Sequence, residues 1–452
     1  MNKSIYFSLT IIYFIISLSI IILVESIYLN IDYETINYIF LGLFIFNYLI
    51  IYSLGGPLSI YGLFLLTSAV FIYGKVISSI FTSKVNIEEI TFFTVEKISN
   101  IDMLNLLACI NLILASISLG YVLNIIIEKR KRLKLIEYSF NRIPLKGIIL
   151  IIVFCISPYI INGLITVIQN GYLSFYTNNL ELLETGSFLP TLYSFGITIS
   201  IVFLSIAIQQ QKNNYIKLFF LILLINAILL TIIGQRGPIV SFFLFYLWYR
   251  NKYIKKIKLS YLFILLFIMI IFSQTTLIFR DDYNNVDKSI LDNYLLFFSQ
   301  QGLTLQVVYL TKYIHEYPLY LIMQNFIPGS IFIYKQLFPH IELYNSSSAL
   351  LSSIINSNLY KSGAGVGWSV YADILLLSNR NPILIILFSF ILGYIISISE
   401  NFKNNYNIII TCISVIFAFR IGFLPRAGLN GIFPLIIYSI IIVSILKRRI
   451  KK

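Results

Sequence analysis

The stretch IKLFFLILLINAILLTIIGQRGPIVSFFLFYLWYR, residues 216–250, decides the fold class. It contains two apolar runs, 216–233 and 238–250, on either side of a short polar turn with Arg236. An apolar run of about 20 residues can cross a bilayer as a helix, because a helix satisfies its own backbone hydrogen bonds. The second run is shorter and would cover only about 20 Å, so we expect it to extend across RGP on one side and NKY on the other.

The whole chain has the same character. Of its 452 residues, 58% are hydrophobic and 12% are charged, whereas soluble domains carry about 25% charged residues. The recurring apolar runs predict an all-α fold, a polytopic transmembrane helical bundle of about twelve spans. The predicted spans are residues 4–24, 37–54, 58–81, 103–127, 145–168, 188–209, 216–233, 238–250, 259–279, 381–399, 405–421 and 429–446. The chain then divides into nine spans (1–279), one large outer loop (280–380) and three spans (381–452).

The charged loops predict the orientation of the bundle. The segments 128–142, 249–260 and 446–452 are strongly basic, whereas 25–34 and 84–102 are acidic or mixed. With twelve spans, every strongly basic loop falls on one side together with both termini, and the positive-inside rule makes that side the cytoplasm. The first run lacks a cleavage site and is predicted to be a retained helix. Because topology accounts for most of the net charge of +14, nucleic acid is not an expected partner.

Arginine recurs at the predicted outer ends of the spans, where lysine is scarce. Arg236 lies at the outer end of spans seven and eight, Arg280 follows span nine, and Arg420 and Arg426 flank the outer end of span eleven. Arg380 lies at the mouth of span ten. The planar guanidinium matches phosphate and stays charged, so this set predicts a site for a strongly anionic group such as a lipid diphosphate. The alternative is that these arginines reach outer-leaflet headgroups.

A glycine-rich motif, YKSGAGVGWSVYADILLLSN, ends the outer loop at residues 360–379. Its glycines do not have the G-x-G-x-x-G spacing and follow no predicted strand, so a nucleotide-binding loop is not expected. We predict a flexible turn that leads into span ten and presents Ser369, Tyr371 and Asp373 at its outer end. Asp373 is then either a helix-start carboxylate or a catalytic or sugar-binding acid.

Three other features of the chain bear on chemistry. The segment 319–334 is apolar but interrupted by Pro328-Gly329, which predicts an interfacial or re-entrant segment. His315 and His340 lie in the outer loop without a second ligand at zinc spacing, so no metal site is predicted, and each is either structural or an acid–base group. The cysteines are predicted to be small core residues without a disulfide framework; they are Cys109, Cys155 and Cys412.

Three motifs together resemble the O-antigen polysaccharide polymerase (Wzy) family. They are GQRG at 234–237, GAGVGWSVYAD at 363–373 and FRIGFLPRAG at 419–428, and the likeness covers roughly residues 150–450 in order and topology. In such proteins the central motif often has Ser or Thr before the arginine, where this chain has Gln235. The glycine motif commonly continues into a glutamate, whereas this chain has the shorter Asp373.

The resemblance implies a metal-independent membrane glycosyltransferase with a GT-C-like fold and no cofactor. Such an enzyme transfers a growing glycan from undecaprenyl diphosphate to a sugar hydroxyl of an incoming undecaprenyl-diphosphate-linked repeat unit. The reaction builds O-antigen or capsular polysaccharide on the outer face of the bacterial cytoplasmic membrane. The implied partners are these two lipid-linked oligosaccharides, membrane lipid and a chain-length regulator protein.

This reaction assigns expected roles to the candidate residues. Arg236 and Arg420 are expected to hold the diphosphate, because fixed arginines stabilise charge that develops on a leaving group; Arg426 and Arg280 support them. Asp373 is the preferred base, and the loop histidine His340 is the other candidate. Aromatic faces are expected to stack on the glycan; they belong to Trp368, Tyr371 and Tyr344.

Two other functions are alternatives. An O-antigen ligase shares the outer arginines and the large loop, but it transfers the glycan to the lipid A core and usually depends on a loop histidine. A lipid-linked oligosaccharide flippase or another transporter would show internal repeats and charges within its spans. The chain has no evident repeat and its charges gather at one face, which favours an enzyme.

Overall fold

The apolar runs of the sequence fold into long helices whose polar interruptions form the turns between them. The computed structural model describes residues 3–26, 31–83, 85–127, 145–171, 188–235, 237–257, 290–327, 329–338, 340, 343–400 and 408–450. Within these residues, nine helices are long and apolar enough to cross a membrane. They are α1 (Lys3–Ser26), α2 (Tyr33–Gly55), α5 (Asn100–Ile127), α6 (Leu145–Asn170), α8 (Leu189–Gln209), α9 (Asn213–Ile233), α19 (Pro382–Glu400), α20 (Ile408–Arg420) with the 3-10 turn η5 (Ile421–Arg426) that continues it, and α21 (Phe433–Ile450) with the 3-10 turn η6 (Leu429–Gly431) that precedes it.

Two predicted spans differ from a single straight helix. The third is a bent pair, α3 (Ile60–Phe71) and α4 (Gly74–Phe81), with an angle of 52° between its halves, so the count rises to ten if the pair is one span. The eighth is α10 (Gly237–Tyr249), which continues as a π-helical turn, η2 (Arg250–Ile254), across NKY as expected. The ninth, 259–279, lies outside the described residues. The all-α, multi-span prediction is confirmed, and the count of twelve stays a prediction.

Helix α5 is the centre of one half of the bundle, and most of its residues are buried. It crosses α19 with no side chain between the two backbones. A Cβ atom on Gly393 would lie 2.0 Å from the carbonyl oxygen of Ile117, and one on Gly120 would lie 2.2 Å from that of Phe390. Small residues allow this approach between helices in a membrane protein. The crossing therefore joins the first third of the chain to its last third.

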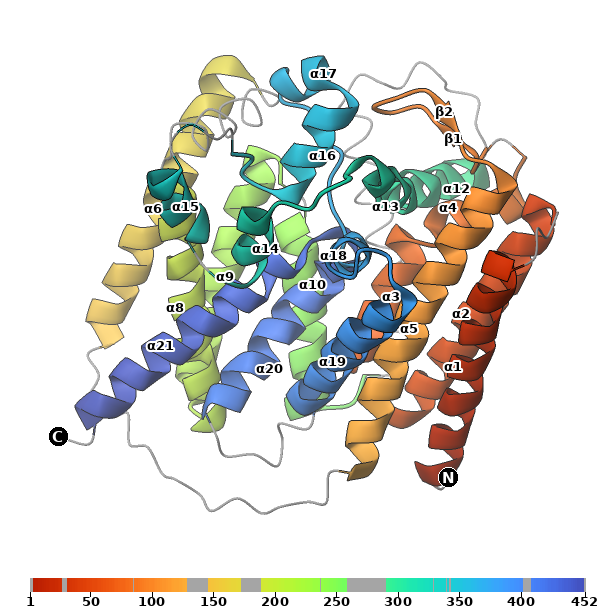
Figure 1. Ribbon diagram of the computed structural model, residues 1–452. Coiled ribbons are helices and arrows are strands. Elements are labelled where there is room, and N and C mark those ends of the chain that lie inside the picture. Colours follow the sequence, from red (N-terminus) through yellow and green to blue (C-terminus); the bar gives the residue numbers. More distant parts are fainter. Residues whose placement is uncertain are drawn as a thin grey trace.

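The outer-loop helices gather at one end of the bundle, opposite the end that holds both termini (Figure 1). A two-stranded antiparallel hairpin, β1 (Glu89–Ile90) and β2 (Glu96–Lys97), lies at the same end. The loop helices are α12 (Ile290–Gln301), α13 (Thr304–Leu310), η3 (Thr311–Tyr313), α14 (Leu319–Phe326), α15 (Ser330–Leu337), α16 (Ser347–Ile355), α17 (Ser357–Lys361) and α18 (Val370–Leu377). From the loop charges, we predict that this end faces outward.

Short helices, none of them spanning, build this outer cap. The segment 319–334 falls on α14 and α15, each 8 residues long and thus about 12 Å in length. Helix α12 is docked on α4, where a Cβ on Gly302 would lie 2.1 Å from the backbone nitrogen of Lys75. The Ser78 hydroxyl also donates a hydrogen bond to the Leu295 carbonyl at 2.7 Å. The cap is therefore fixed to the early helices of the bundle.

Candidate functional site

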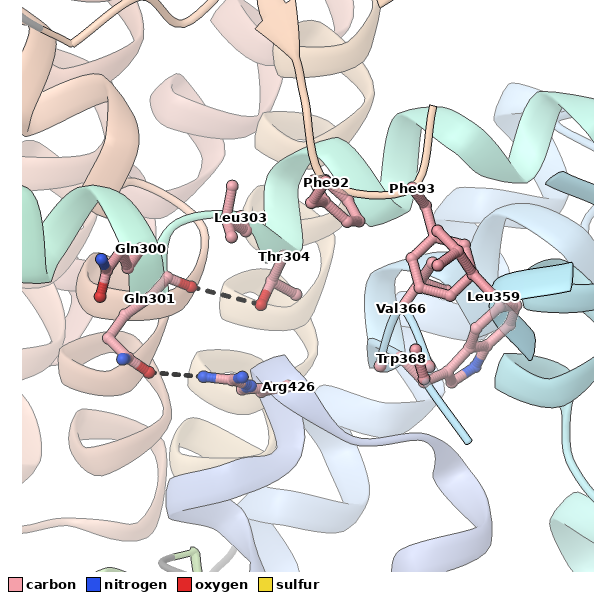
Figure 2. Close-up of a pocket in the computed structure, with 13 residues that line it drawn as sticks. Phe92, Phe93, Gln300, Gln301, Leu303, Thr304, Leu359, Val366, Trp368 and Arg426 are labelled. Atoms are coloured by element: carbon pink, nitrogen blue, oxygen red, sulfur yellow. Dashed lines mark hydrogen bonds between the residues drawn. The ribbon is translucent and has the colours of Figure 1, made fainter. Parts of the chain in front are cut away.

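A pocket of about 430 Å³ opens where the hairpin, the α12–α13 turn and the glycine motif meet (Figure 2). Its wall combines aromatic rings, side-chain amides and one arginine. The thirteen lining residues are Phe92, Phe93, Gln300, Gln301, Leu303, Thr304, Leu359, Ala364, Gly365, Val366, Gly367, Trp368 and Arg426. Two motifs predicted to be functional, the glycine motif and FRIGFLPRAG, thus contribute to one cavity.

The local structure of the glycine motif positions Trp368. Gly367 has a φ of 77°, a left-handed conformation that favours glycine. Ser369 caps the N-terminus of α18: its hydroxyl accepts from the Tyr371 backbone nitrogen at 3.3 Å and donates to the Pro425 carbonyl at 2.7 Å. The Trp368 indole donates from Nε1 to Asp373 Oδ1 at 2.8 Å. The ring is therefore held in the pocket wall by a helix cap and a buried carboxylate.

Asp373 is fully buried and accepts hydrogen bonds from four donors. Besides Trp368, Oδ1 accepts from the Tyr317 hydroxyl at 3.2 Å and from Asn325 Nδ2 at 3.3 Å, and Oδ2 accepts from the Leu429 backbone nitrogen at 2.6 Å. Burial raises the pKa of this carboxyl from 3.8 to about 6, although the four hydrogen bonds oppose the rise.

These donors come from three separate parts of the outer cap. Tyr317 precedes α14, Asn325 lies within it, and Leu429 begins the 3-10 turn η6 (Leu429–Gly431). The turn can approach the carboxylate because Gly428, which precedes it, has no side chain. A Cβ at this position would lie only 2.8 Å from Asp373 Oδ2. Asp373 thus lies in the first turn of α18, the position predicted for a helix-start carboxylate. It also connects the glycine motif to α14 and η6.

Arg420 ends α20 beside a group of polar side chains between the helices. Its half-buried guanidinium lies 5.3 Å from the Phe419 ring centroid and interacts electrostatically with Tyr193. The Nε atom is buried without a hydrogen-bond partner among the described residues. Tyr193 accepts a hydrogen bond from Asn226 at 2.9 Å and packs on Tyr159, with ring centroids 4.8 Å apart. The arginine therefore has an unused donor next to aromatic hydroxyl groups.

Arg236 and Arg280 lie outside the described residues, but both neighbours of Arg236 are described. Gln235 Nε2 donates to the Tyr159 hydroxyl at 3.4 Å, which places it beside the ring that packs on Tyr193. A Cβ on Gly237 would lie 3.2 Å from the Phe423 ring. One flank of Arg236, Gly237, therefore lies against η5 (Ile421–Arg426), and the other, Gln235, contacts the Tyr159–Tyr193 pair.

Arg426 faces the pocket on the other side of η5. Its Nη1 donates to Gln301 Oε1 at 2.5 Å (Figure 2), and its guanidinium carbon lies 5.5 Å from the Phe71 ring centroid. Arg380, which has a φ of 58°, donates from Nη2 to the Thr311 hydroxyl at 3.4 Å. The structure therefore brings Arg426 to the glycine motif, whereas Arg380 contacts a different part of the outer cap.

The remaining predicted residues lie in different environments. Tyr371 is fully buried, with its hydroxyl 2.9 Å from that of Ser68 and its ring stacked on Phe64. Ser369, Tyr371 and Asp373 are thus all buried in the cap rather than presented at its surface. His340 is exposed between α15 and α16. Tyr344 is half-buried, and its ring makes an edge contact with Tyr360.

Sequence reasoning did not find half of the pocket wall. Phe92 and Phe93 are the only aromatic residues in the charged loop 84–102, and this adjacent pair is a signal that could have pointed to them. Gln300 and Gln301 carry no comparable signal, because their position depends on the docking of α12. In the part of the chain that the structure describes, no group of three or more His, Cys, Asp or Glu residues is placed to hold a metal ion.

Comparison with known proteins identifies the family. The family model for O-antigen polysaccharide polymerase Wzy matches residues 6–451, nearly the whole chain. No curated protein and no solved structure matches the chain significantly. The family match confirms the resemblance found in the three motifs and extends it to the first four predicted spans. The chain belongs to the O-antigen polysaccharide polymerase Wzy family, multi-pass membrane glycosyltransferases that polymerise lipid-linked repeat units.

Proposed function

We propose that this polymerase transfers a growing glycan from undecaprenyl diphosphate to a sugar hydroxyl of an incoming lipid-linked repeat unit at the outer face of the cytoplasmic membrane. The observation that carries this proposal is that GQRG and the glycine motif both contact FRIGFLPRAG, Gly237 at Phe423 and Ser369 at the Pro425 carbonyl. The family match favours polymerisation over the ligase and transporter alternatives. A chain-length regulator protein stays a predicted partner.

The proposed reaction explains why arginines are required. The bond between the donor sugar's anomeric carbon and the diphosphate oxygen breaks, and its electron pair stays on the diphosphate. The acceptor hydroxyl oxygen bonds to the anomeric carbon and gives up its proton to a base. Because negative charge on the diphosphate rises as the bond breaks, fixed cations stabilise the transition state more than the ground state.

We assign the diphosphate to Arg420 and Arg236, with Arg426 and Arg280 in support. Arg420 suits this role because its Nε donor is unused among the described residues and the flanks of Arg236 pack nearby. A planar guanidinium can donate two parallel hydrogen bonds to a phosphate. The polymerase assignment itself is tested by expressing the chain in cells that make its lipid-linked repeat unit but lack their own polymerase. A ladder of glycan lengths on a gel is the expected result.

The proton acceptor is proposed to be Asp373 or His340. A pKa of about 6 suits a base that works near neutral pH, but the Asp373 carboxylate is enclosed by its four donors. To reach it, the acceptor hydroxyl would replace one of the two longer bonds, from Tyr317 or Asn325. His340 is exposed and needs no such replacement.

The pH dependence of the polymerisation rate separates the two bases. If Asp373 is the base, we expect the rate of the purified enzyme to rise as pH increases through about 6, and we expect Asp373→Asn to lose this step while His340→Ala keeps it. A change in protein stability caused by ionisation of Asp373 cannot produce this rise in rate. Because the folded-state pKa lies above 3.8, this group's contribution to the free energy of unfolding is largest below about pH 4 and falls as pH rises to 6.

The opposite pattern would assign the base to His340. Loss of the rate in His340→Ala, with an unchanged profile in an Asp373→Asn enzyme that folds normally, would leave Asp373 as a positioning residue for Trp368. If the product made by the wild-type enzyme were glycan on the lipid A core without a ladder, the ligase alternative would replace the proposal.

A further inference from the structure

We propose that the pocket walled by Phe92, Phe93 and Trp368 is a subsite that binds one sugar ring of the lipid-linked repeat unit. This inference rests on the proposed function. The pocket is built by three segments that are far apart in the sequence: the hairpin, the α12–α13 turn and the glycine motif. The sugar would lie between the aromatic wall and the exposed backbone of the glycine motif.

The composition of the pocket fits a sugar. A volume of about 430 Å³ lies within the range of small-molecule sites, which are largely apolar with a few fixed polar groups. Aromatic faces can pack against the C–H face of a pyranose, and the Gln300 and Gln301 amides provide both donors and acceptors for hydroxyl groups. Arg426 is the one charged residue among the thirteen that line the pocket, so the cavity also accommodates a sugar with an anionic substituent.

The aromatic wall is held in place from two sides. On one side, Glu96 of the hairpin accepts hydrogen bonds from Lys312 at 2.5 Å and from the Tyr313 hydroxyl at 2.8 Å. On the other side, Asn356 Nδ2 donates to the Phe93 carbonyl at 3.2 Å. The short hairpin is thus attached to the outer cap at Glu96 and in the middle of its loop at Phe93, and the rings are preorganised for a ligand.

Part of the pocket wall, at Gly365 and Gly367, is backbone without side chains. A Cβ on Gly365 would meet only the Ser352 hydroxyl, at 4.0 Å, and a Cβ on Gly367 would meet nothing within 4 Å. The same Ser352 hydroxyl accepts a hydrogen bond from the Val366 backbone nitrogen at 3.1 Å, which fixes the loop. Glycine at 365 is therefore not required by packing or by a left-handed φ, and open space above it suits a bound ring.

A substitution that fills this space tests the proposal in cells. We expect Gly365→Val to keep normal protein levels in the membrane, because a Cβ at this position meets nothing closer than 4.0 Å, but to reduce long chains on the gel at least about tenfold. Phe92→Ala is expected to reduce them by a similar factor through loss of a stacking face. The matched control is Val95→Ala, in the same hairpin loop at a position that is 92% exposed; it should leave the ladder unchanged.

Direct binding provides an independent measurement. The chain has two tryptophans, Trp248 and Trp368, so Trp248→Phe leaves Trp368 in the pocket wall as the single tryptophan, which is excited selectively over tyrosine at about 295 nm. The probe is the repeat-unit oligosaccharide released from its lipid by mild acid, which carries no diphosphate. We expect it to change the Trp368 emission in a saturable way, and we expect Gly365→Val to weaken this binding at least about tenfold.

The outcomes separate this inference from the proposed function. A full ladder in Gly365→Val and Phe92→Ala, together with unchanged Trp368 emission, overturns the subsite and leaves the polymerase proposal standing. If the wild-type chain makes no ladder in the test cells, the polymerase proposal fails and the fluorescence titration alone decides whether the pocket binds the sugar. A response to pyrophosphate but not to the oligosaccharide would also overturn the sugar subsite.

Discussion

Replacing Arg420 with alanine is expected to reduce the glycan ladder to single repeat units on the acceptor. Removing one fixed donor from a site that stabilises developing negative charge typically lowers the rate about 10²–10³-fold. Arg420→Lys should recover only part of the rate, because the ammonium group lacks the planar pair of donors that a phosphate accepts. The measurement is the ladder on a gel, normalised to the amount of polymerase in the membrane.

A second arginine provides the control for this prediction. Arg250 is exposed at the opposite end of α10 from the GQRG turn, and Arg250→Ala should leave the ladder intact. The gel also separates mechanisms, since loss of a ligase leaves the acceptor bare whereas loss of a polymerase leaves single repeats. Unchanged long chains in Arg420→Ala, with normal protein levels, would show that this arginine does not hold the diphosphate.

Replacing Gly393 with leucine is expected to prevent stable folding. The added Cβ would lie 2.0 Å from the Ile117 carbonyl oxygen and 2.7 Å from its carbonyl carbon, and backbone atoms cannot move aside as a side chain can. Helix α19 would have to separate from α5, which would also break the hydrogen bond from Asn124 to Ser397. We expect a loss of several kcal/mol, in the range of the most damaging core substitutions, measured as a lower unfolding temperature or loss of protein from the membrane.

The control substitution is Gly42→Ala in α2. A Cβ there would meet nothing within 4 Å, and alanine is favoured over glycine in a helix by about 1 kcal/mol. We therefore expect unchanged or slightly higher stability. Equal stability of Gly393→Leu and the wild type would mean that the α5–α19 crossing is looser than described.

The sequence predicts the helices better than it predicts their shape. Hydropathy finds the third span at 58–81 as one run, but it cannot detect the 52° bend between α3 and α4. At the bend, Gly74 approaches the Phe298 carbonyl of α12, so the shape involves a partner more than two hundred residues away. The extension of α10 across NKY was predictable, because a membrane span needs a minimum length.

The candidate site could likewise be predicted from the sequence only in part. The motifs at Trp368, Asp373 and Arg426 stand out in the sequence because glycine and charge are unusual beside apolar runs, and the structure brings these three close together. The burial of Asp373 was not predictable, since its donors come from separate segments of the cap. The adjacent Phe92 and Phe93 are visible in the sequence, but their place beside the glycine motif was missed for the same physical reason, because tertiary packing sets it.

The docking of α12 on α4 also has a consequence for biogenesis. The ribosome completes α4 long before α12, so until then the backbone at Gly74 lacks its contact with the Phe298 carbonyl and the Ser78 hydroxyl lacks its contact with the Leu295 carbonyl. A nascent chain that stops short of α12 therefore leaves the α12-facing side of α4 uncovered. We expect membrane quality-control proteases to degrade such fragments quickly and to spare chains that include α12. Pulse-chase of truncated chains would measure this difference in lifetime.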